Sequence, residues 1–260
     1  MPYGDYNPND DGFRQTAGSA NIGYSFMPDW SIRLQGLDAR GDVQFSDGFD
    51  PTRPGLTARI RMETVSGSMT LKGKVAAGWS TTLRYGVSRD DSNTDVAAYS
   101  FDLGDFATRQ TMVSWQNDIT SPVGTVLAAV EQLHQAVSSN EFEFPVDHRN
   151  ITSLQLGLNG RAGPQSWQGN VRSDENTQFG HQVTGALAYG FDLAPHWRLG
   201  ASGGTSFVAP SFDQLYYPFD SNPLLRPQHG RKFLALLHIR NRHCSSGGHA
   251  RLPIFGPMPW

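Results

Sequence analysis

The chain has 260 residues, of which 38% are hydrophobic and 17% are charged, and its formal net charge is −3. This near-neutral chain has no basic stripe, so it gives no electrostatic basis for binding nucleic acid. The only cysteine is Cys244, which excludes an internal disulfide framework. No apolar run approaches the roughly 18 residues that a membrane-spanning helix requires.

The dominant pattern is an alternation of apolar and polar side chains. In WSIRLQ (30–35), Trp30, Ile32 and Leu34 alternate with polar residues, and 79–89, 183–193 and 196–208 behave similarly. A period of two places neighbouring side chains on opposite faces of a strand. We therefore predict about eleven strands, at 13–26, 30–44, 57–72, 78–90, 105–119, 123–138, 149–161, 166–175, 181–193, 196–207 and 229–240.

The connections between these strands alternate in length. Short turns rich in Gly, Pro and Asp suit tight reversals of the chain, and they fall at 25–30, 71–79, 120–124, 162–165 and 193–196. Longer polar stretches lie between them, near 42–56, 89–105, 138–149, 174–181 and 208–229. We expect all neighbouring strands to pair as antiparallel hairpins, with no helix between them.

Strands of ten or more residues with aromatic residues near their ends indicate an all-β, antiparallel transmembrane β-barrel. Backbone groups in lipid must be hydrogen-bonded within the protein, so only helices and closed barrels span a membrane. Four tryptophans begin a strand just after a short turn, which suits an aromatic girdle at the periplasmic interface: Trp30, Trp79, Trp167 and Trp197. A soluble β-sandwich or propeller is the alternative, but its strands average about five or six residues.

Two segments carry a family resemblance. GASGGTSFVAPSFDQLYYPFDSNPLLRPQHG (200–230) resembles the TonB-dependent outer-membrane receptors, in which a strand is followed by G-T-[SA]-[FY]-[KV]-A-P, L-Y and N-P-x-L-x-P-E. WQGNVRSDENTQFGHQVTGALAYGF (167–191) resembles the family's R-x-D-[DE]-N-[ST]-Q-F-G loop with its flanking strands. The resemblance covers roughly residues 5–235.

Within the family, the chain is most similar to the vitamin B12 (cobalamin) receptors, on NDDGF (9–13), SDENTQFG (173–180) and QLYY (214–217). Ferric-siderophore receptors share versions of these segments. The resemblance implies a Gram-negative outer-membrane transporter rather than an enzyme, with a plug inside a 22-stranded barrel. It also implies three partners, namely cobalamin or a ferric siderophore, outer-membrane lipid, and the TonB complex, which acts through the plug. A passive porin-like barrel and a barrel hydrolase are the alternatives.

The chain also departs from the family pattern. The expected plug is missing, and the predicted strands would supply about half of the family's barrel. After Arg231 the alternation is lost in KFLALLHIRNRHCSSGGHARLPIFGPMPW, which a frameshift would explain. We therefore expect residues 1–230 to form part of a receptor barrel and residues 231–260 to be an aberrant tail, so that the receptor is incomplete in this chain.

The candidate ligand contacts are aromatic residues of the QFG and 205–227 loops: Phe179, Phe212, Tyr216, Tyr217 and Phe219. Aromatic side chains supply a large contact area at a small entropic cost. Packing of the loop, or anchoring at the membrane interface, would equally account for them. Four arginines are expected to face the lumen, where they would contact plug or ligand or simply solvate the interior: Arg33, Arg84, Arg172 and Arg198.

The resemblance to cobalamin receptors also implies calcium binding in the loop that corresponds to NPNDDGF. The candidate ligands are Asn7, Asn9 and Asp11, with Asp42 from the next loop. Ca²⁺ takes six to eight oxygen ligands at about 2.3–2.6 Å, which carboxylates and amides can supply. Ordinary solvated acids in a loop are the alternative, and no other cofactor is expected.

Overall fold

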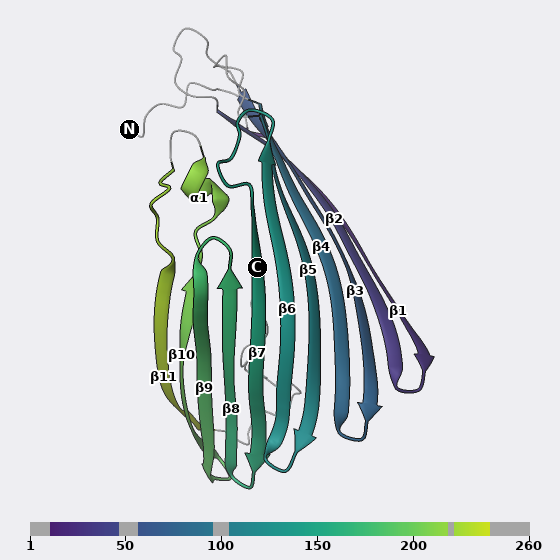
Figure 1. The fold of residues 1–260 in the computed structure, drawn as a ribbon, viewed down its shortest axis with the longest axis vertical. Coiled ribbons are helices and arrows are strands. Elements are labelled where there is room, and N and C mark those ends of the chain that lie inside the picture. The colour runs from purple at the N-terminus through teal and green to yellow at the C-terminus, as the bar shows by residue number, and fades with distance from the viewer. Residues whose placement is uncertain (1–10, 47–56, 96–103, 218–220, 240–260) are drawn as a thin grey trace.

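The computed structural model describes residues 11–46, 57–95, 104–217 and 221–239. Eleven strands form one antiparallel sheet in chain order (Figure 1). Their bounds are β1 Phe13–Met27, β2 Trp30–Ser46, β3 Thr57–Ala76, β4 Trp79–Asp95, β5 Gly104–Ser121, β6 Gly124–Ser139, β7 His148–Ala162, β8 Gln165–Asn176, β9 Gly180–Ala194, β10 Trp197–Val208 and β11 Gln228–Ile239. The prediction of eleven antiparallel strands is confirmed. Among the described residues, no helix is long and apolar enough to cross a membrane.

The register of the strands gives the sheet one apolar and one polar face. Ile32 pairs with Leu71, which pairs with Leu83, whereas Arg33 pairs with Thr70, which pairs with Arg84. Directly paired residues share a face and successive residues alternate. We name the face of Ile32 the outer face and the face of Arg33 the inner face.

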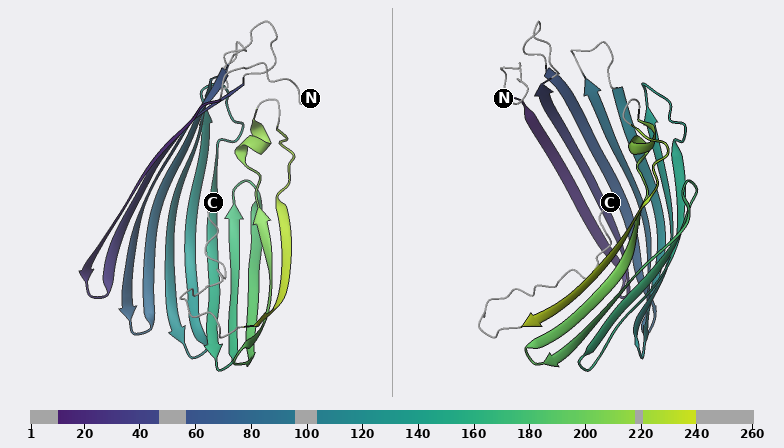
Figure 2. Two further views of the ribbon diagram at one scale, coloured as in Figure 1. Left: turned by 180° about the vertical axis from the view of Figure 1, so that it is seen from behind. Right: turned by 90° about the vertical axis from the view of Figure 1, so that its left-hand side faces the viewer.

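The apolar character of the outer face continues across the whole sheet. Its large side chains are between 37% and 67% exposed because nothing in the described structure covers them, and they include Leu34, Tyr85, Val113, Trp115, Val130, Leu154, Leu156, Val183, Leu187 and Leu199. Soluble proteins rarely expose an apolar surface of this extent. The curved, single-layered sheet (Figure 2) therefore has the two-sided pattern of a barrel wall in lipid.

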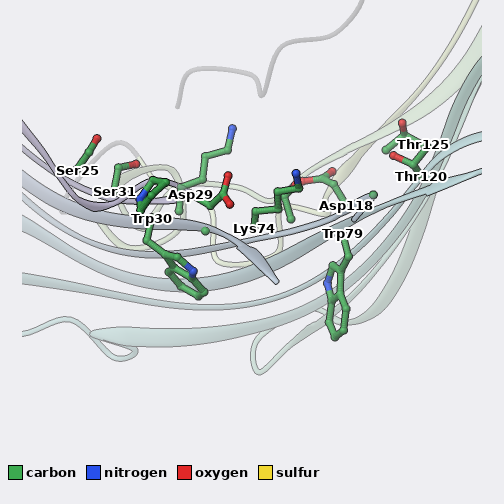
Figure 3. A pocket seen from close by; sticks show the side chains of 14 residues that line it. Ser25, Asp29, Trp30, Ser31, Lys74, Trp79, Asp118, Thr120 and Thr125 are labelled. Carbon is green, nitrogen blue, oxygen red and sulfur yellow. The ribbon is translucent and has the colours of Figure 1, made fainter. Parts of the chain in front are cut away.

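The tryptophans at the short turns lie on the outer face. Figure 3 shows Trp30 and Trp79 projecting away from the polar side chains Lys74 and Asp118, which point to the inside of the curved sheet. Register places Trp167 and Trp197 on the same outer face. The Trp30 ring also covers Gly73 of the next strand so closely that a Cβ there would collide with it. This arrangement explains a glycine within a strand, since only glycine leaves room for the ring.

A five-residue helix, α1 (Phe212–Tyr216), interrupts the connection between β10 and β11, so the prediction that no helix would occur was wrong. Ser211 caps it: the Ser211 hydroxyl accepts from the Gln214 N–H at 3.2 Å, and the Gln214 side chain accepts from the Ser211 N–H at 3.0 Å. This reciprocal capping box satisfies two backbone donors. Its signature, a serine followed three residues later by a glutamine, is present in the sequence, but a search for period-two alternation does not detect it.

The last described strand extends further than the predicted barrel segment. β11 pairs with β10 without interruption from Gln228 opposite Val208 to Ile239 opposite Trp197. Residues 231–239, which the sequence analysis assigned to the tail, therefore belong to this strand. The division of the chain at residue 230 and the frameshift remain predictions, and 240–260 lie outside the described residues.

Candidate ligand-binding site

The connection after β10 is anchored to the inner face near the long-loop end of the sheet (Figure 1). Arg149 of β7 donates to the carbonyl oxygen of Pro210 at 2.9 Å and to the side-chain oxygen of Gln135 at 2.6 Å. Its guanidinium carbon also lies 4.7 Å from the centroid of the Phe212 ring. Arg149 is only 8% exposed, so one buried cation joins two strands to the loop.

The loop has a small apolar core of its own. Two side chains of α1 are buried, since Phe212 is 5% exposed and Leu215 is 1% exposed. Between them, partial burial raises the pKa of the Asp213 carboxyl above its usual value. Because its ring lies against Arg149, Phe212 packs the loop in this structure and has no surface to offer a ligand.

The half-buried aromatic residues around α1 come from three separate connections. Tyr217 meets Phe142 edge to face at 5.6 Å between ring centroids, and Phe142 lies 4.8 Å from Phe144. The Tyr216 hydroxyl accepts a 2.9 Å hydrogen bond from the side chain of Gln178, next to Phe179 in the β8–β9 turn. We call Phe142, Phe144, Phe179, Tyr216 and Tyr217 the mouth cluster.

Of the five predicted ligand contacts, Tyr216 and Tyr217 are neighbours in the chain, and Phe179 follows Gln178, whose side chain donates to the Tyr216 hydroxyl. Phe212 is buried beneath them, and Phe219 lies outside the described residues. The sequence analysis missed Arg149, Gln178, Phe142 and Phe144. The alternation EFEF at 141–144, in a connection that is otherwise polar, was a usable signal for the last two.

Below the mouth cluster, the inner face carries charges that neutralise one another. Arg172 contacts Glu131 and Asp174, each at 2.8 Å, and donates to the Ser153 hydroxyl at 2.8 Å. Arg198 contacts Asp192 at 2.9 Å. The prediction that Arg33, Arg84, Arg172 and Arg198 lie on the polar face is confirmed by the register. A hydrated wall of this kind suits the passage of a polar ligand.

The predicted calcium ligands are only partly described. Asn7 and Asn9 lie outside the described residues, and Asp11 is exposed. The placement of Asp42 in a loop was wrong: strand pairing extends β2 to Ser46, so Asp42 lies on the outer face of this strand, where its carboxylate contacts Arg59 at 3.3 Å. In the described ranges, no group of three or more His, Cys, Asp or Glu side chains could hold a metal ion. Calcium binding stays a prediction.

Comparison with known proteins agrees with this architecture. Residues 2–233 match the family model described as TonB dependent receptor-like, beta-barrel. Over 236 residues the chain is 25% identical to the vitamin B12 transporter BtuB of Photobacterium profundum, with 88% of this chain and 37% of that protein covered. The chain thus spans little more than a third of the length of this relative.

Solved structures share the fold at low sequence identity. The siderophore receptor PirA of Pseudomonas aeruginosa matches with a TM-score of 0.73 and 13% identity, over 88% of this chain and 44% of that one. PirA of Acinetobacter baumannii matches with a TM-score of 0.72 and 11% identity, over 92% and 42%. Identities this low establish the fold alone.

The family match covers most of the chain, and the strand order, the two-faced sheet and the girdle tryptophans all agree with it. Barrels of this family lie in the outer membrane of Gram-negative bacteria, and the family consists of transport receptors rather than enzymes. The chain belongs to the TonB-dependent receptor-like β-barrel family.

Proposed function

We propose that this chain supplies barrel wall and an outward ligand loop to an outer-membrane receptor that takes up a scarce ligand. The observation that carries the proposal is the mouth cluster, in which half-buried aromatic rings of two connections contact each other above a polar inner face. The β8–β9 turn joins them through the hydrogen bond from Gln178 to Tyr216. Rings with polar tips contribute contact area and orient a ligand through their hydroxyl groups. A path of neutralised charges beneath them suits onward movement of that ligand.

The proposed ligand is cobalamin, and a ferric siderophore is the second candidate. Cobalamin is favoured because the chain is 25% identical to a protein named as a vitamin B12 transporter. The siderophore is favoured only by fold, through the two PirA structures. As in other members of the family, uptake would draw on the TonB complex through a plug inside the barrel.

Titration of the full chain in detergent with cyanocobalamin, followed by calorimetry, tests the proposal. We expect saturable binding that Tyr217→Ala weakens by roughly two- to tenfold, since an aromatic contact contributes about 0.5–1.5 kcal/mol beyond the area it buries. Tyr85→Ala is the matched control, because Tyr85 lies on the outer face and is 44% exposed. Saturable binding of ferric enterobactin alone would favour the second candidate. No saturable binding of either compound would favour a passive pore.

We also propose that Ca²⁺ orders the segment 5–12 and the segment 42–50, which begins in the last residues of β2. The support is the oxygen-rich set Asn7, Asn9, Asp11 and Asp42, of which Asp42 would have to exchange its contact with Arg59 for the metal. Limited proteolysis with Ca²⁺ and with chelator measures the effect. Equal cleavage rates under the two conditions would contradict calcium binding.

A further inference from the structure

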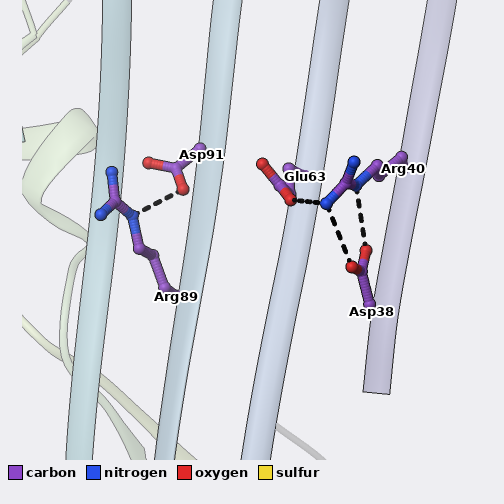
Figure 4. A network of polar contacts seen from close by, with 5 residues as sticks. All are labelled: Asp38, Arg40, Glu63, Arg89 and Asp91. Atoms are coloured by element: carbon purple, nitrogen blue, oxygen red, sulfur yellow. Dashed lines mark hydrogen bonds and ion pairs between the residues drawn. The ribbon is translucent and has the colours of Figure 1, made fainter. Parts of the chain in front are cut away.

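A band of charged residues lies on the outer face, next to the apolar surface. Figure 4 shows Arg40 bound to Asp38 and Glu63, and Arg89 bound to Asp91. Register places these side chains on the apolar face, because Arg40 and Leu34, like Arg89 and Tyr85, are separated by an even number of positions along one strand. The band therefore faces the membrane rather than the lumen.

The depth of this band follows from strand geometry. Arg89 lies ten positions along β4 from Trp79, and Arg40 lies ten positions along β2 from Trp30. At about 3.3 Å per residue and a tilt of about 35–45°, ten positions span about 23–27 Å of bilayer. The apolar band of an outer-membrane barrel is about 25 Å tall. With the tryptophans at the periplasmic interface, the arginines reach the headgroups of the opposite, external leaflet.

Arg89 and Arg109 form an open pair of cations within this band. The two residues are direct cross-strand partners in β4 and β5. Asp91 occupies only the Nε of Arg89, at 2.6 Å, so both terminal nitrogens remain free to donate. Arg109 is exposed and makes no ion pair or hydrogen bond with any other described residue. Like charges placed directly opposite are destabilising, and a bound anion would relieve that repulsion.

The surroundings of the pair fit a lipid rather than a free anion. Val87 and Val113 are the nearest large apolar residues on the membrane side, 41% and 43% exposed, and Trp115 lies beyond at 51%. On the other side, Arg89 borders a groove of about 890 Å³ whose lining includes Arg14, Arg40 and Arg61 together with the carboxylates of Asp42, Glu63, Asp91 and Asp105, so the open pair of cations lies at Arg89 and Arg109 rather than in the groove. A guanidinium fork matches phosphate oxygens, while the valines offer a surface for acyl chains.

We propose that Arg89 and Arg109 bind the phosphate of a lipid headgroup in the external leaflet, with its acyl chains along Val87, Val113 and Trp115. The inference depends on the orientation of the barrel in the outer membrane. It is independent of which ligand the mouth cluster binds. Failure of cobalamin binding would therefore leave it standing, and its own failure would leave the proposed function standing.

The test is calorimetric titration of the full chain in detergent with lipid A, which carries phosphates on a multiply acylated headgroup. We expect Arg89→Gln/Arg109→Gln to lower the affinity for lipid A at least about tenfold, since a hydrogen bond to a charged group is worth about 1.5–3 kcal/mol. Arg33→Gln/Arg84→Gln is the charge-matched control, because it removes two inner-face arginines from β2 and β4. The control should bind lipid A like the unmodified chain.

Two further arms keep the proposal falsifiable. Circular dichroism checks the strand content of each variant. Arg89→Lys/Arg109→Lys keeps both charges and should retain part of the affinity for lipid A, and this variant supplies the measurement if the glutamine variant does not fold. Dephosphorylated lipid A should bind the unmodified chain no better than the glutamine variant. Equal affinity of dephosphorylated and intact lipid A would overturn the proposal, as would equal losses in the variant and its control. Full displacement by millimolar inorganic phosphate would identify a free-anion site instead of a lipid site.

Discussion

Arg149 is the residue on which the arrangement of the outward loop depends. It is buried, and its hydrogen bonds to Gln135 and Pro210 and its contact with Phe212 satisfy a cation that would otherwise be costly to remove from water. The side chain of Arg149 thus fixes α1 relative to β6 and β7. Tyr216 of the mouth cluster is the last residue of α1, and Tyr217 follows it directly in the chain.

We predict that Arg149→Met releases the 209–217 segment from the sheet. Methionine is of similar length but leaves the Pro210 carbonyl and the Gln135 side chain without their donor, at a cost of about 1.5–3 kcal/mol. Limited proteolysis should cut this segment at least about tenfold faster than in the unmodified chain. The control is Arg161→Met at the other end of β7, where the arginine is 63% exposed and pairs with Asp192. Equal cleavage of the two variants would refute the anchoring role.

The sequence predicted the aromatic side of the site better than its polar side. Tyr216, Tyr217 and Phe179 were recognisable because they interrupt polar stretches with aromatic residues. The role of Arg149 was not, because its partners Gln135 and Pro210 lie on other strands or loops, at separations that no local pattern encodes. Phe212 was predicted with the tyrosines because residue type alone does not distinguish a buried aromatic side chain from a half-exposed one.

At the scale of the strand, alternation decides what each side chain faces. Leu34 and Gln35 are neighbours in β2, yet Leu34 pairs with Met69 on the outer face and Gln35 pairs with Ser68 on the inner face. The first meets hydrocarbon in a membrane and the second meets water. The two positions therefore form a matched pair for testing the orientation of the sheet.

We predict that Leu34→Arg destabilises the chain in lipid and that Gln35→Arg does not. Leu34 lies near the middle of the apolar band, where an outward arginine costs about 2–4 kcal/mol, whereas an inward arginine remains in a polar, water-accessible environment. Urea titration of both variants in phosphatidylcholine vesicles, followed by tryptophan fluorescence, gives the two free energies of unfolding. Equal costs at the two positions would contradict the assignment of the faces.

The strands were predictable because the alternation of apolar and polar residues repeats many times along each strand of this single-layered sheet. A strand such as β4, with 17 residues, offers far more alternating positions than the short strands of a soluble sandwich. Strand ends were less well placed: β3 continues to Ala76, past the predicted end at residue 72, because pairing with β4 persists into the turn. Helix α1 was not predicted because its five residues are too few to show the 3.6-residue period of a helix.

For the molecule as a whole, the described sheet is open. Its strand order ends at β1 on one side and β11 on the other, and these two strands are not paired with each other among the described residues. Unpaired backbone groups cost several kcal/mol each in lipid, and in water they promote pairing between chains. The edges of the sheet therefore govern how this chain behaves on its own.

We predict that the full chain in detergent associates through these edges. Size-exclusion chromatography with light scattering should show species larger than one chain, and electrophoresis should show no heat-modifiable monomer. Ala17→Pro in β1 should reduce association, because the register set by the bond from the Gln44 N–H to the Gly12 carbonyl directs the Ala17 N–H to the open edge, and proline there cannot donate to another chain. A detergent-stable, heat-modifiable monomer would show that the edges are closed in some other way.

The strictly sequential order of β1 to β11 has a consequence for biogenesis. Each described strand pairs only with its predecessor and successor in the chain, so no strand pairing in the described sheet has to wait for a distant segment to arrive. The loop-closure entropy for each addition is that of a single hairpin, which keeps the contact order low for an all-β protein. The sheet can thus grow at one edge, hairpin by hairpin, because each newly paired strand offers its free backbone groups to the next strand in the chain.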